Sequence, residues 1–335
     1  MILKYISMRE IKSIKKTNFI KKLLIKICRI FGYELIDQST LEFPVSNKNY
    51  QEISSISGNK SISLGLGETP ITRKVKNLDI IVKTCTSVQL VSQNKKRIFE
   101  KEKSEYTFRT ISSLIKTAKD LRKKFQEIEI KFTIVDVNSP NSDLKKILSK
   151  ISNEGFEVKN FQVENIKSYK SNMATTMASI RQSFNLAKNC NDLIYFVEDD
   201  YIHKTEALAE MLFAYEKFSS IFKDEIFLLS SDYPYLYKKM SDTNILIGEN
   251  THWRTVEESL LTFMTSKKMI EKYFDKLIDM ATNESNPFEK NLHKIYEIEK
   301  CLSPIPSLSV HCTNINSVFG LSPNVDLKKL WDENK

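Results

Sequence analysis

The chain has 335 residues, of which 41% are hydrophobic and 28% are charged, and this composition is typical of a folded globular protein with one large or two ordinary domains. It contains only seven glycines, and the lack of GxGxxG and GxxxxGKS/T runs excludes the usual glycine-rich phosphate loops. Its five cysteines include no CxxC pair, which argues against a disulfide framework or a four-cysteine zinc site and favours a reducing, cytoplasmic compartment.

The positive charge is concentrated at the N-terminus. The net charge is +9, and residues 1–30 contain nine basic residues and one acid, so eight of the nine net charges lie there. Apolar residues recur between these lysines at helical spacing, which predicts a basic amphipathic helix that ends near Gly32. The apolar residues of this helix are Ile20, Leu23, Leu24, Ile27 and Phe31.

Two interpretations of this arm, residues 1–36, remain open. Lysines interrupt its apolar runs, so we expect neither a membrane span nor a signal peptide. A helix that lies on an anionic membrane surface through residues 1–31, at the inner face of the cell membrane, fits the charge. A helix docked on its own domain fits about as well. The rest of the chain has a net charge of only +1, so we expect no nucleic-acid partner.

The chain after the arm divides into three parts. Residues 37–76 are rich in Ser, Asn, Gly and Thr and are interpreted as a linker. Residues 77–320 form the main domain, and residues 321–335 a C-terminal tail. In the domain, short apolar runs alternate with longer helical stretches, which predicts an α/β fold with a mostly parallel central sheet flanked by helices. Ligands bind such sheets outside the carboxyl ends of the strands.

The segment IYFVEDDYIH, residues 194–203, places three carboxylates, Glu198, Asp199 and Asp200, at the end of an apolar strand. These like charges repel one another unless a cation lies between them, and Mg²⁺ or Mn²⁺ bound with a substrate diphosphate is such a cation. Alternate residues of a strand share a face, so we expect Glu198 and Asp200 to face the ligand and Asp199 the other side. Alternatively, the acids cap the helix that begins near Thr205.

The order of these segments resembles family 2 and related GT-A glycosyltransferases, which move a sugar from a nucleotide diphosphate donor to an acceptor. DIIVKTC, FTIVDVNSPNSD, NMATTMASIRQSFNLA and LIYFVEDDY are similar to the nucleotide-binding half of that family, up to its DxD motif. The resemblance implies a GT-A fold over residues 77–320, a nucleotide-diphosphate sugar as donor and Mn²⁺ or Mg²⁺ as cofactor. Val137 and the initial glutamate of the motif depart from the family pattern, which leaves the nucleotide base and the choice of metal open.

The resemblance also implies roles for single residues. Asp136 takes the position of the aspartate that contacts the nucleotide base. His311, after the segment CLSPIPSL, is similar to a histidine that several metal-using GT-A families employ as a further ligand, although a structural role fits about as well. The residues predicted to bind the donor are Thr84, Asp136, Arg181, Glu198 and Asp199. The residues predicted to bind the metal are Asp200, Glu198 and His311.

An inverting transferase needs a carboxylate that takes the proton of the acceptor hydroxyl, whereas a retaining one does not clearly need this base. Three glutamates are candidates, in the order Glu289, Glu257, Glu258. Glu289 stands where family 2 enzymes carry the acid that opens a helix after the acceptor loop, although Lys290 stands where Asp is usual. For each of the three, a solvated helix glutamate is about as good an interpretation.

These observations predict a metal-dependent glycosyltransferase that acts on a glycan or lipid-linked acceptor. Trp253 and Arg254 are further candidates for contacts with the acceptor or the diphosphate, although structural roles fit both residues equally well. His203 is expected at a helix cap or the surface. Two other classes stay open. One is a catalytically silent, membrane-associated scaffold with the same domain. The other is a nucleotidyltransferase, although KTCTSVQL lacks the glycine-rich loop that this class normally has.

Overall fold

The structure, a computed structural model, describes residues 19–33, 42–44, 67–87, 98–164, 173–237, 240, 242–285, 287–312, 320, 322 and 324–335. The chain divides into two units, Met1–Ile71 and Thr72–Lys335. In the first unit, helix α1 (Phe19–Ile30) occupies the predicted basic arm. Two short parallel strands, β1 (Glu42–Pro44) and β2 (Gly67–Thr69), are also part of this unit.

The apolar side chains of α1 are exposed within the structure. Phe19 and Ile30 are 80% and 81% exposed, and Leu23, Leu24 and Ile27 are exposed as well. The helix is followed by Gly32, whose φ of +80° is a left-handed conformation that favours glycine. Among the described residues, no helix combines the length and the hydropathy that a bilayer span requires.

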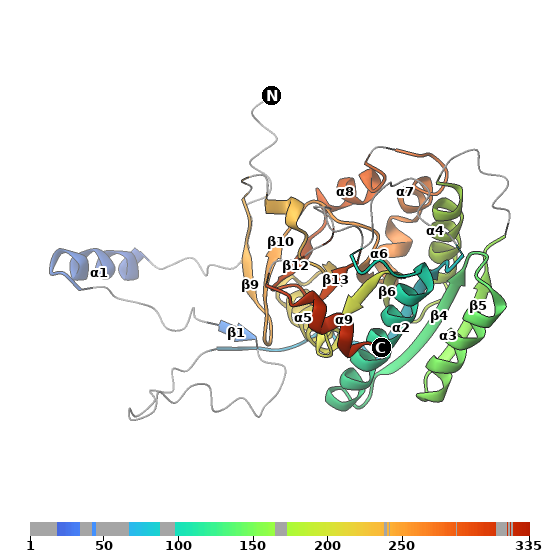
Figure 1. Ribbon diagram of the computed structural model, residues 1–335. Coiled ribbons are helices and arrows are strands. Elements are labelled where there is room, and N and C mark those ends of the chain that lie inside the picture. The colour runs from blue at the N-terminus through green and yellow to red at the C-terminus, as the bar shows by residue number, and fades with distance from the viewer. Residues whose placement is uncertain are drawn as a thin grey trace. The chain divides into compact units, whose positions relative to one another are not determined.

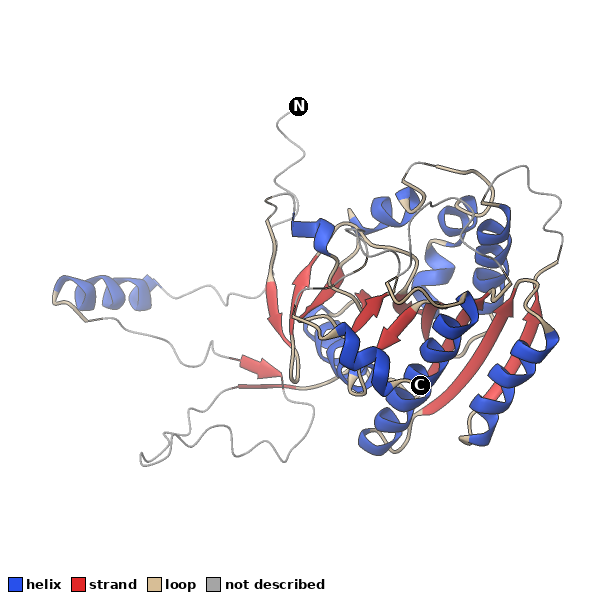
Figure 2. Cartoon of the chain, in the orientation of Figure 1, coloured by secondary structure: helices blue, strands red, loops and turns tan. Residues whose placement is uncertain are grey.

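Strands and helices alternate through most of the second unit, as predicted (Figure 2). Its strands are β3 (Asn77–Thr84), β4 (Glu129–Asp136), β5 (Glu157–Gln162), β6 (Leu193–Glu198), β7 (Tyr201–His203), β8 (Phe227–Leu229), β9 (Ile245–Ile247), β10 (His252–Thr255), β11 (Phe263–Ser266), β12 (Cys301–Ile305) and β13 (Ser309–His311). Its helices are α2 (Lys103–Lys124), α3 (Asn141–Asn153), α4 (Ala174–Ala187), α5 (Ala207–Phe222), the 3-10 helix η3 (Pro234–Tyr237), α6 (Lys267–Lys272), α7 (Phe274–Asp279), α8 (Lys290–Tyr296) and α9 (Leu327–Glu333).

Within the described residues, nine strands form one sheet in the order β5-β4-β3-β6-β11-β8-β12-β10-β9. Strands β5, β4, β3 and β6 are parallel, as are β8 and β12, whereas β11 and β10 run antiparallel to their neighbours. Helices α2, α3 and α5 pack together, and α4, α6, α7 and α8 form a second group (Figure 1). The predicted fold class, a mostly parallel α/β sheet flanked by helices, is confirmed.

The central parallel strand β3 is buried on both faces. In β3, Leu78, Ile80, Ile81 and Val82 are all at most 1% exposed, although consecutive residues of a strand point to opposite faces. Helices therefore cover both faces of this strand, as is usual for parallel strands. Its apolar interior ends at Lys83, next to the edge where ligands are expected.

The domain begins earlier in the chain than the predicted boundary at residue 77. The backbone N–H groups of Thr72 and Arg73 both donate to Ser220 Oγ of α5, each at 3.0 Å. The Val75 N–H donates to Glu216 Oε1 at 2.7 Å. These bonds attach residues 72–76, which we interpreted as linker, to the second unit.

The segment interpreted as a C-terminal tail contains helix α9, which packs on the domain. The Trp331 ring is 4% exposed and stacks on Phe99 with a centroid distance of 4.1 Å. The Arg109 guanidinium of α2 lies over the same ring, 4.2 Å from its centroid. Burial of this aromatic surface explains why the end of the chain is helical and attached.

Candidate active site

Strands β3, β4 and β6 end at the same edge of the sheet, where open α/β sheets bind ligands. Lys83 of β3 lies beside Glu198 of β6 in the parallel register, and Lys83 Nζ donates to Glu198 Oε1 at 3.1 Å. The backbone N–H of Glu198 donates to Thr262 Oγ1, also at 3.1 Å. The sequence analysis did not identify Lys83 as a site residue, although a lysine at the end of an apolar strand was a usable signal.

The structure brings Asp200 and His311 together. Strands β7 and β13 pair in antiparallel register, with His311 opposite Tyr201, and the Cys312 N–H donates to the Asp200 carbonyl oxygen at 2.7 Å. As a result, His311 Nε2 lies 3.4 Å from Asp200 Oδ1, with the two side chains 15% and 14% exposed. The imidazole also stacks on the Tyr201 ring, at 4.6 Å between centroids.

Glu289 directly precedes helix α8 and is half-buried. Burial raises the pKa of its carboxyl group from 4.5 to about 7. The nearby Glu198 carboxylate raises this pKa further, whereas Lys83 and His311 oppose the shift. Glu289 therefore lies within electrostatic range of Glu198 and His311, two of the predicted metal ligands. A carboxyl group with a pKa near 7 is also a suitable general base at neutral pH.

The other two candidate bases have different surroundings. Glu258 is half-buried. Burial is the main cause that raises the pKa of Tyr235, and the Glu258 and Glu289 carboxylates both raise this pKa further. Glu258 therefore lies near the same region as Glu289. Glu257 is exposed on the loop before β11. Of the three glutamates, Glu289 has the environment best suited to proton transfer.

Asp199 points away from Glu198, as the strand alternation predicted. Its Oδ2 accepts hydrogen bonds from the Cys85 N–H and from Thr107 Oγ1, each at 2.9 Å, and its Oδ1 accepts from Lys103 Nζ. These partners attach the end of β6 to helix α2. The environment of Asp199 is therefore that of a structural carboxylate, and its predicted contact with a donor stays a prediction.

Asp136 and Thr84 lie opposite each other at the ends of β4 and β3. Thr84 Oγ1 donates to Asp136 Oδ1 at 2.7 Å, and the Ser139 N–H donates to Asp136 Oδ2 at 3.0 Å. The Asp136 residue is fully buried. Lys83 and Thr84 are consecutive residues of β3 and point to opposite faces of the sheet. The Thr84–Asp136 pair therefore lies on the opposite face from the Lys83–Glu198 pair. The predicted contact of Asp136 with a nucleotide base stays a prediction.

Arg181 is a residue of α4, and its Nη2 donates to Thr282 Oγ1, beyond the end of α7, at 2.6 Å. Its predicted donor contact also stays a prediction. Trp253 is fully buried, and its Nε1 donates to Glu210 Oε1 at 3.2 Å, so the structural one of its two predicted roles fits its surroundings. Arg254 Nη2 donates to Asp232 Oδ1 at 2.8 Å, an interaction that anchors the arginine within the domain.

His203 is buried, so its expected position at the surface is wrong. Its Nε2 is 2.6 Å from the Tyr195 hydroxyl oxygen, and its Nδ1 is 3.3 Å from Ser113 Oγ. Burial lowers the pKa of His203 to about 3. The imidazole is therefore neutral at physiological pH and joins β7 to its neighbours by neutral hydrogen bonds.

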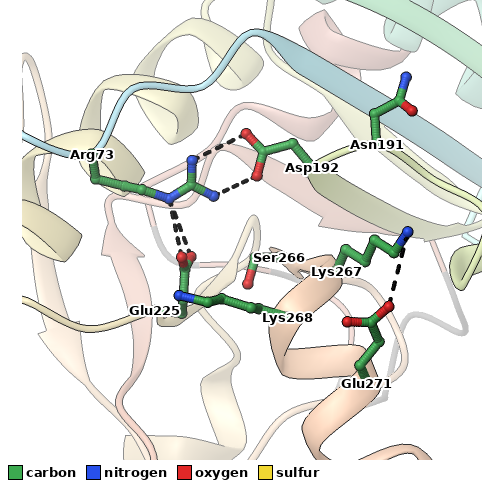
Figure 3. A pocket seen from close by; sticks show the side chains of 8 residues that line it. All are labelled: Arg73, Asn191, Asp192, Glu225, Ser266, Lys267, Lys268 and Glu271. Atoms are coloured by element: carbon green, nitrogen blue, oxygen red, sulfur yellow. Dashed lines mark hydrogen bonds and ion pairs between the residues drawn. The ribbon is translucent and has the colours of Figure 1, made fainter.

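A cavity of about 400 Å³ lies at the opposite, amino-terminal edge of β6 (Figure 3). Most of its charged groups pair with one another: Arg73 donates to Asp192 and Glu225, and Lys267 pairs with Glu271. Asp192 directly precedes β6, whereas Glu198 ends it. This cavity is therefore separate from the carboxyl edge, and its ion pairs stabilise the start of the domain.

The donor atoms near Asp200 suit a divalent metal ion in part. In the portion of the chain that the structure describes, no three His, Cys, Asp or Glu side chains are grouped to hold a metal. Asp200 and His311 provide one carboxylate and one imidazole, both of which bind Mn²⁺. Divalent ions at nucleotide sites usually take only one or two protein carboxylates and complete their coordination with phosphate oxygens and water. The Asp200–His311 pair fits that arrangement.

No protein-family model matches the chain, and no curated protein matches its sequence. Among solved structures, it is similar to TarS 1–349 of S. aureus, free and in complex with UDP. In both cases the identity is 16%, the match covers 68% of this chain and 57% of that chain, and the TM-score is 0.42. It is also similar to the galactosyltransferase LgtC in complex with donor and acceptor sugar analogues, with 11% identity, 66% and 70% coverage and a TM-score of 0.36.

Proposed function

We propose that the chain is a glycosyltransferase that moves a sugar from a nucleotide diphosphate to a hydroxyl group of a glycan or lipid-linked acceptor. The observation that supports this best is the Asp200–His311 contact, together with Glu289, whose pKa burial and the Glu198 carboxylate raise. Asp200 and His311 suit a divalent ion, and Glu289 carries a pKa near 7. Metal-assisted departure of a diphosphate and removal of a hydroxyl proton need these two kinds of group.

Asp200 and His311 would hold the Mn²⁺ or Mg²⁺ ion. When bound, this ion neutralises negative charge on the departing diphosphate. Glu198 faces the same edge but is paired with Lys83, so we place it next to the ribose or diphosphate rather than as a full metal ligand. Asp199 supports this loop from the other face through its bonds to Cys85, Thr107 and Lys103.

Glu289 is proposed as the general base. As the acceptor oxygen forms its bond to the anomeric carbon, the bond from that carbon to the diphosphate oxygen breaks. The hydroxyl proton passes to the Glu289 carboxylate, and the nucleotide diphosphate leaves with the bonding electron pair. A single displacement of this kind inverts the anomeric carbon, so the stereochemistry of the product tests the assignment of the base.

Equilibrium binding and sugar transfer on the full chain test the function. We expect at least one of UDP, GDP, CDP, TDP and ADP to bind more tightly with Mn²⁺ present, and Asp200→Asn to weaken the Mn²⁺ effect about tenfold or more. Glu289→Gln should bind the same nucleotide normally but lose transfer from the matching nucleotide sugar by about 100-fold or more. If none of these five nucleotides binds, the proposal is refuted.

We further propose that α1 binds the inner face of the cell membrane. Its apolar side chains are exposed, and the first 30 residues carry most of the net positive charge. Each basic residue near an anionic surface contributes about 1 kcal/mol before salt screening. Deletion of residues 1–33 should abolish sedimentation with phosphatidylglycerol vesicles and leave transfer to a soluble acceptor intact. Equal sedimentation with neutral phosphatidylcholine vesicles would argue against the electrostatic contribution.

A further inference from the structure

Lys83 is a largely buried cation at the proposed donor site. Its side chain is only 12% exposed, and it is directed along the carboxyl edge of the sheet, toward Glu198. It is close enough to Glu289 to lower the pKa of that carboxyl group. A single ammonium group therefore contacts one carboxylate of the site and acts electrostatically on another.

The hydrogen bonds of this ammonium group are incomplete. A lysine ammonium has three N–H donors, and among the described residues Glu198 is its hydrogen-bond partner, through one bond of 3.1 Å. Burying a charged donor without partners is costly, so an anion that accepts its other N–H groups would be bound favourably. At this edge, the proposed substrate brings such an anion, its diphosphate.

The charge balance of the site leads to the same conclusion. Glu198, Asp200 and Glu289 gather three carboxyl groups at the edge, and a diphosphate would add further negative charge. Lys83 is a positive charge that belongs to the fold, whereas a divalent ion must be recruited from solution. A phosphate next to Lys83 would therefore meet a fixed positive charge whether or not a metal is bound.

We propose that the Lys83 ammonium binds a phosphate group of the donor directly, so that the chain binds a nucleotide diphosphate even without a divalent ion. This inference rests on the proposed glycosyltransferase function. The competing explanation is that Lys83 only neutralises Glu198. The two explanations differ when both members of the pair are made neutral. If Lys83 contacts the phosphate, removal of Glu198 does not restore the nucleotide affinity that was lost with Lys83. If Lys83 only neutralises Glu198, removal of Glu198 does restore it.

The test measures UDP and GDP binding to the full chain by calorimetry, in EDTA and in Mn²⁺. We expect wild type to bind one of them in EDTA, and Lys83→Met to weaken that binding about tenfold or more, as for loss of a charge-assisted hydrogen bond. The double variant Lys83→Met with Glu198→Gln should stay as weak. Lys131→Met is the control, because it removes a positive charge near the other end of strand β4, where Lys131 pairs with Glu129.

Recovery of wild-type affinity in the double variant would overturn the proposal, as would binding by wild type only when Mn²⁺ is present. Those two results leave the glycosyltransferase function intact, whereas a lack of nucleotide binding in both buffers refutes that function as well. A second measurement needs no variant. Saturating nucleotide in EDTA should reduce acetylation of Lys83, but not of Lys131, as measured by mass spectrometry. Unchanged acetylation of Lys83 would also overturn the proposal.

Discussion

Replacement of Glu289 by glutamine is expected to stabilise the folded chain at neutral pH. Burial gives this carboxyl group a pKa of about 7 in the folded chain, against 4.5 for the ordinary group. Between these values the folded state binds the proton more tightly than the unfolded state, so stability is lost as the pH rises through this window. The loss amounts to about 3 kcal/mol once the carboxylate is fully ionised.

Glutamine has nearly the same shape as a protonated glutamate and carries no charge at any pH. The unfolding free energies of Glu289→Gln and wild type should therefore agree at about pH 4 and differ by up to about 3 kcal/mol in favour of the variant at about pH 8. Urea denaturation followed by tryptophan fluorescence measures both values. Other titrating groups are common to the two proteins and cancel in the difference. Glu257→Gln, at an exposed position, is the matched control and should show no such trend.

A difference between Glu289→Gln and wild type that does not change with pH would refute this reasoning, because it would mean that burial does not disfavour the charged form of Glu289. A less stable variant at about pH 8 would show instead that the carboxylate makes favourable contacts in the fold. If the variant is both more stable and inactive, Glu289 is a residue whose function costs stability.

Three further perturbations test the structural interpretation of other residues. Gly248→Ala would place a Cβ atom 2.2 Å from Glu210 Oε1 and 2.6 Å from the Thr251 carbonyl oxygen, so it should lower the unfolding free energy by about 2 kcal/mol or more; an unchanged melting temperature would contradict this. Asp199→Asn removes the negative charge that pairs with the half-buried Lys103, which should destabilise the fold by about 1–3 kcal/mol. Nucleotide affinity should be retained by that variant, and a selective loss of affinity at full stability would favour the donor-binding role instead. Arg73→Ala removes the guanidinium between Asp192 and Glu225, and chemical denaturation should show a loss of about 2–3 kcal/mol; an unchanged unfolding free energy would contradict this.

The order of elements in the domain was predictable because it depends on local patterns. Apolar runs such as that of β6 indicate buried strands without knowledge of their partners. Likewise, the alternation of side chains along a strand placed Glu198 and Asp199 on opposite faces. The apolar periodicity between the lysines located α1. Boundaries were less accurate, since Thr72 and Arg73 are attached to the domain by Ser220 of a distant helix.

The α/β plan and the acidic end of β6 follow from residues that are neighbours along the chain, so local patterns were enough to predict both. The surroundings of these acids depend instead on contacts between distant segments. Lys83 meets Glu198 through the pairing of β3 with β6, and Asp199 is used by helix α2. The pKa of Glu289 depends on burial by segments distant in the chain. Solvent exclusion and long-range ion pairs arise when the chain is packed, so no local pattern contains them.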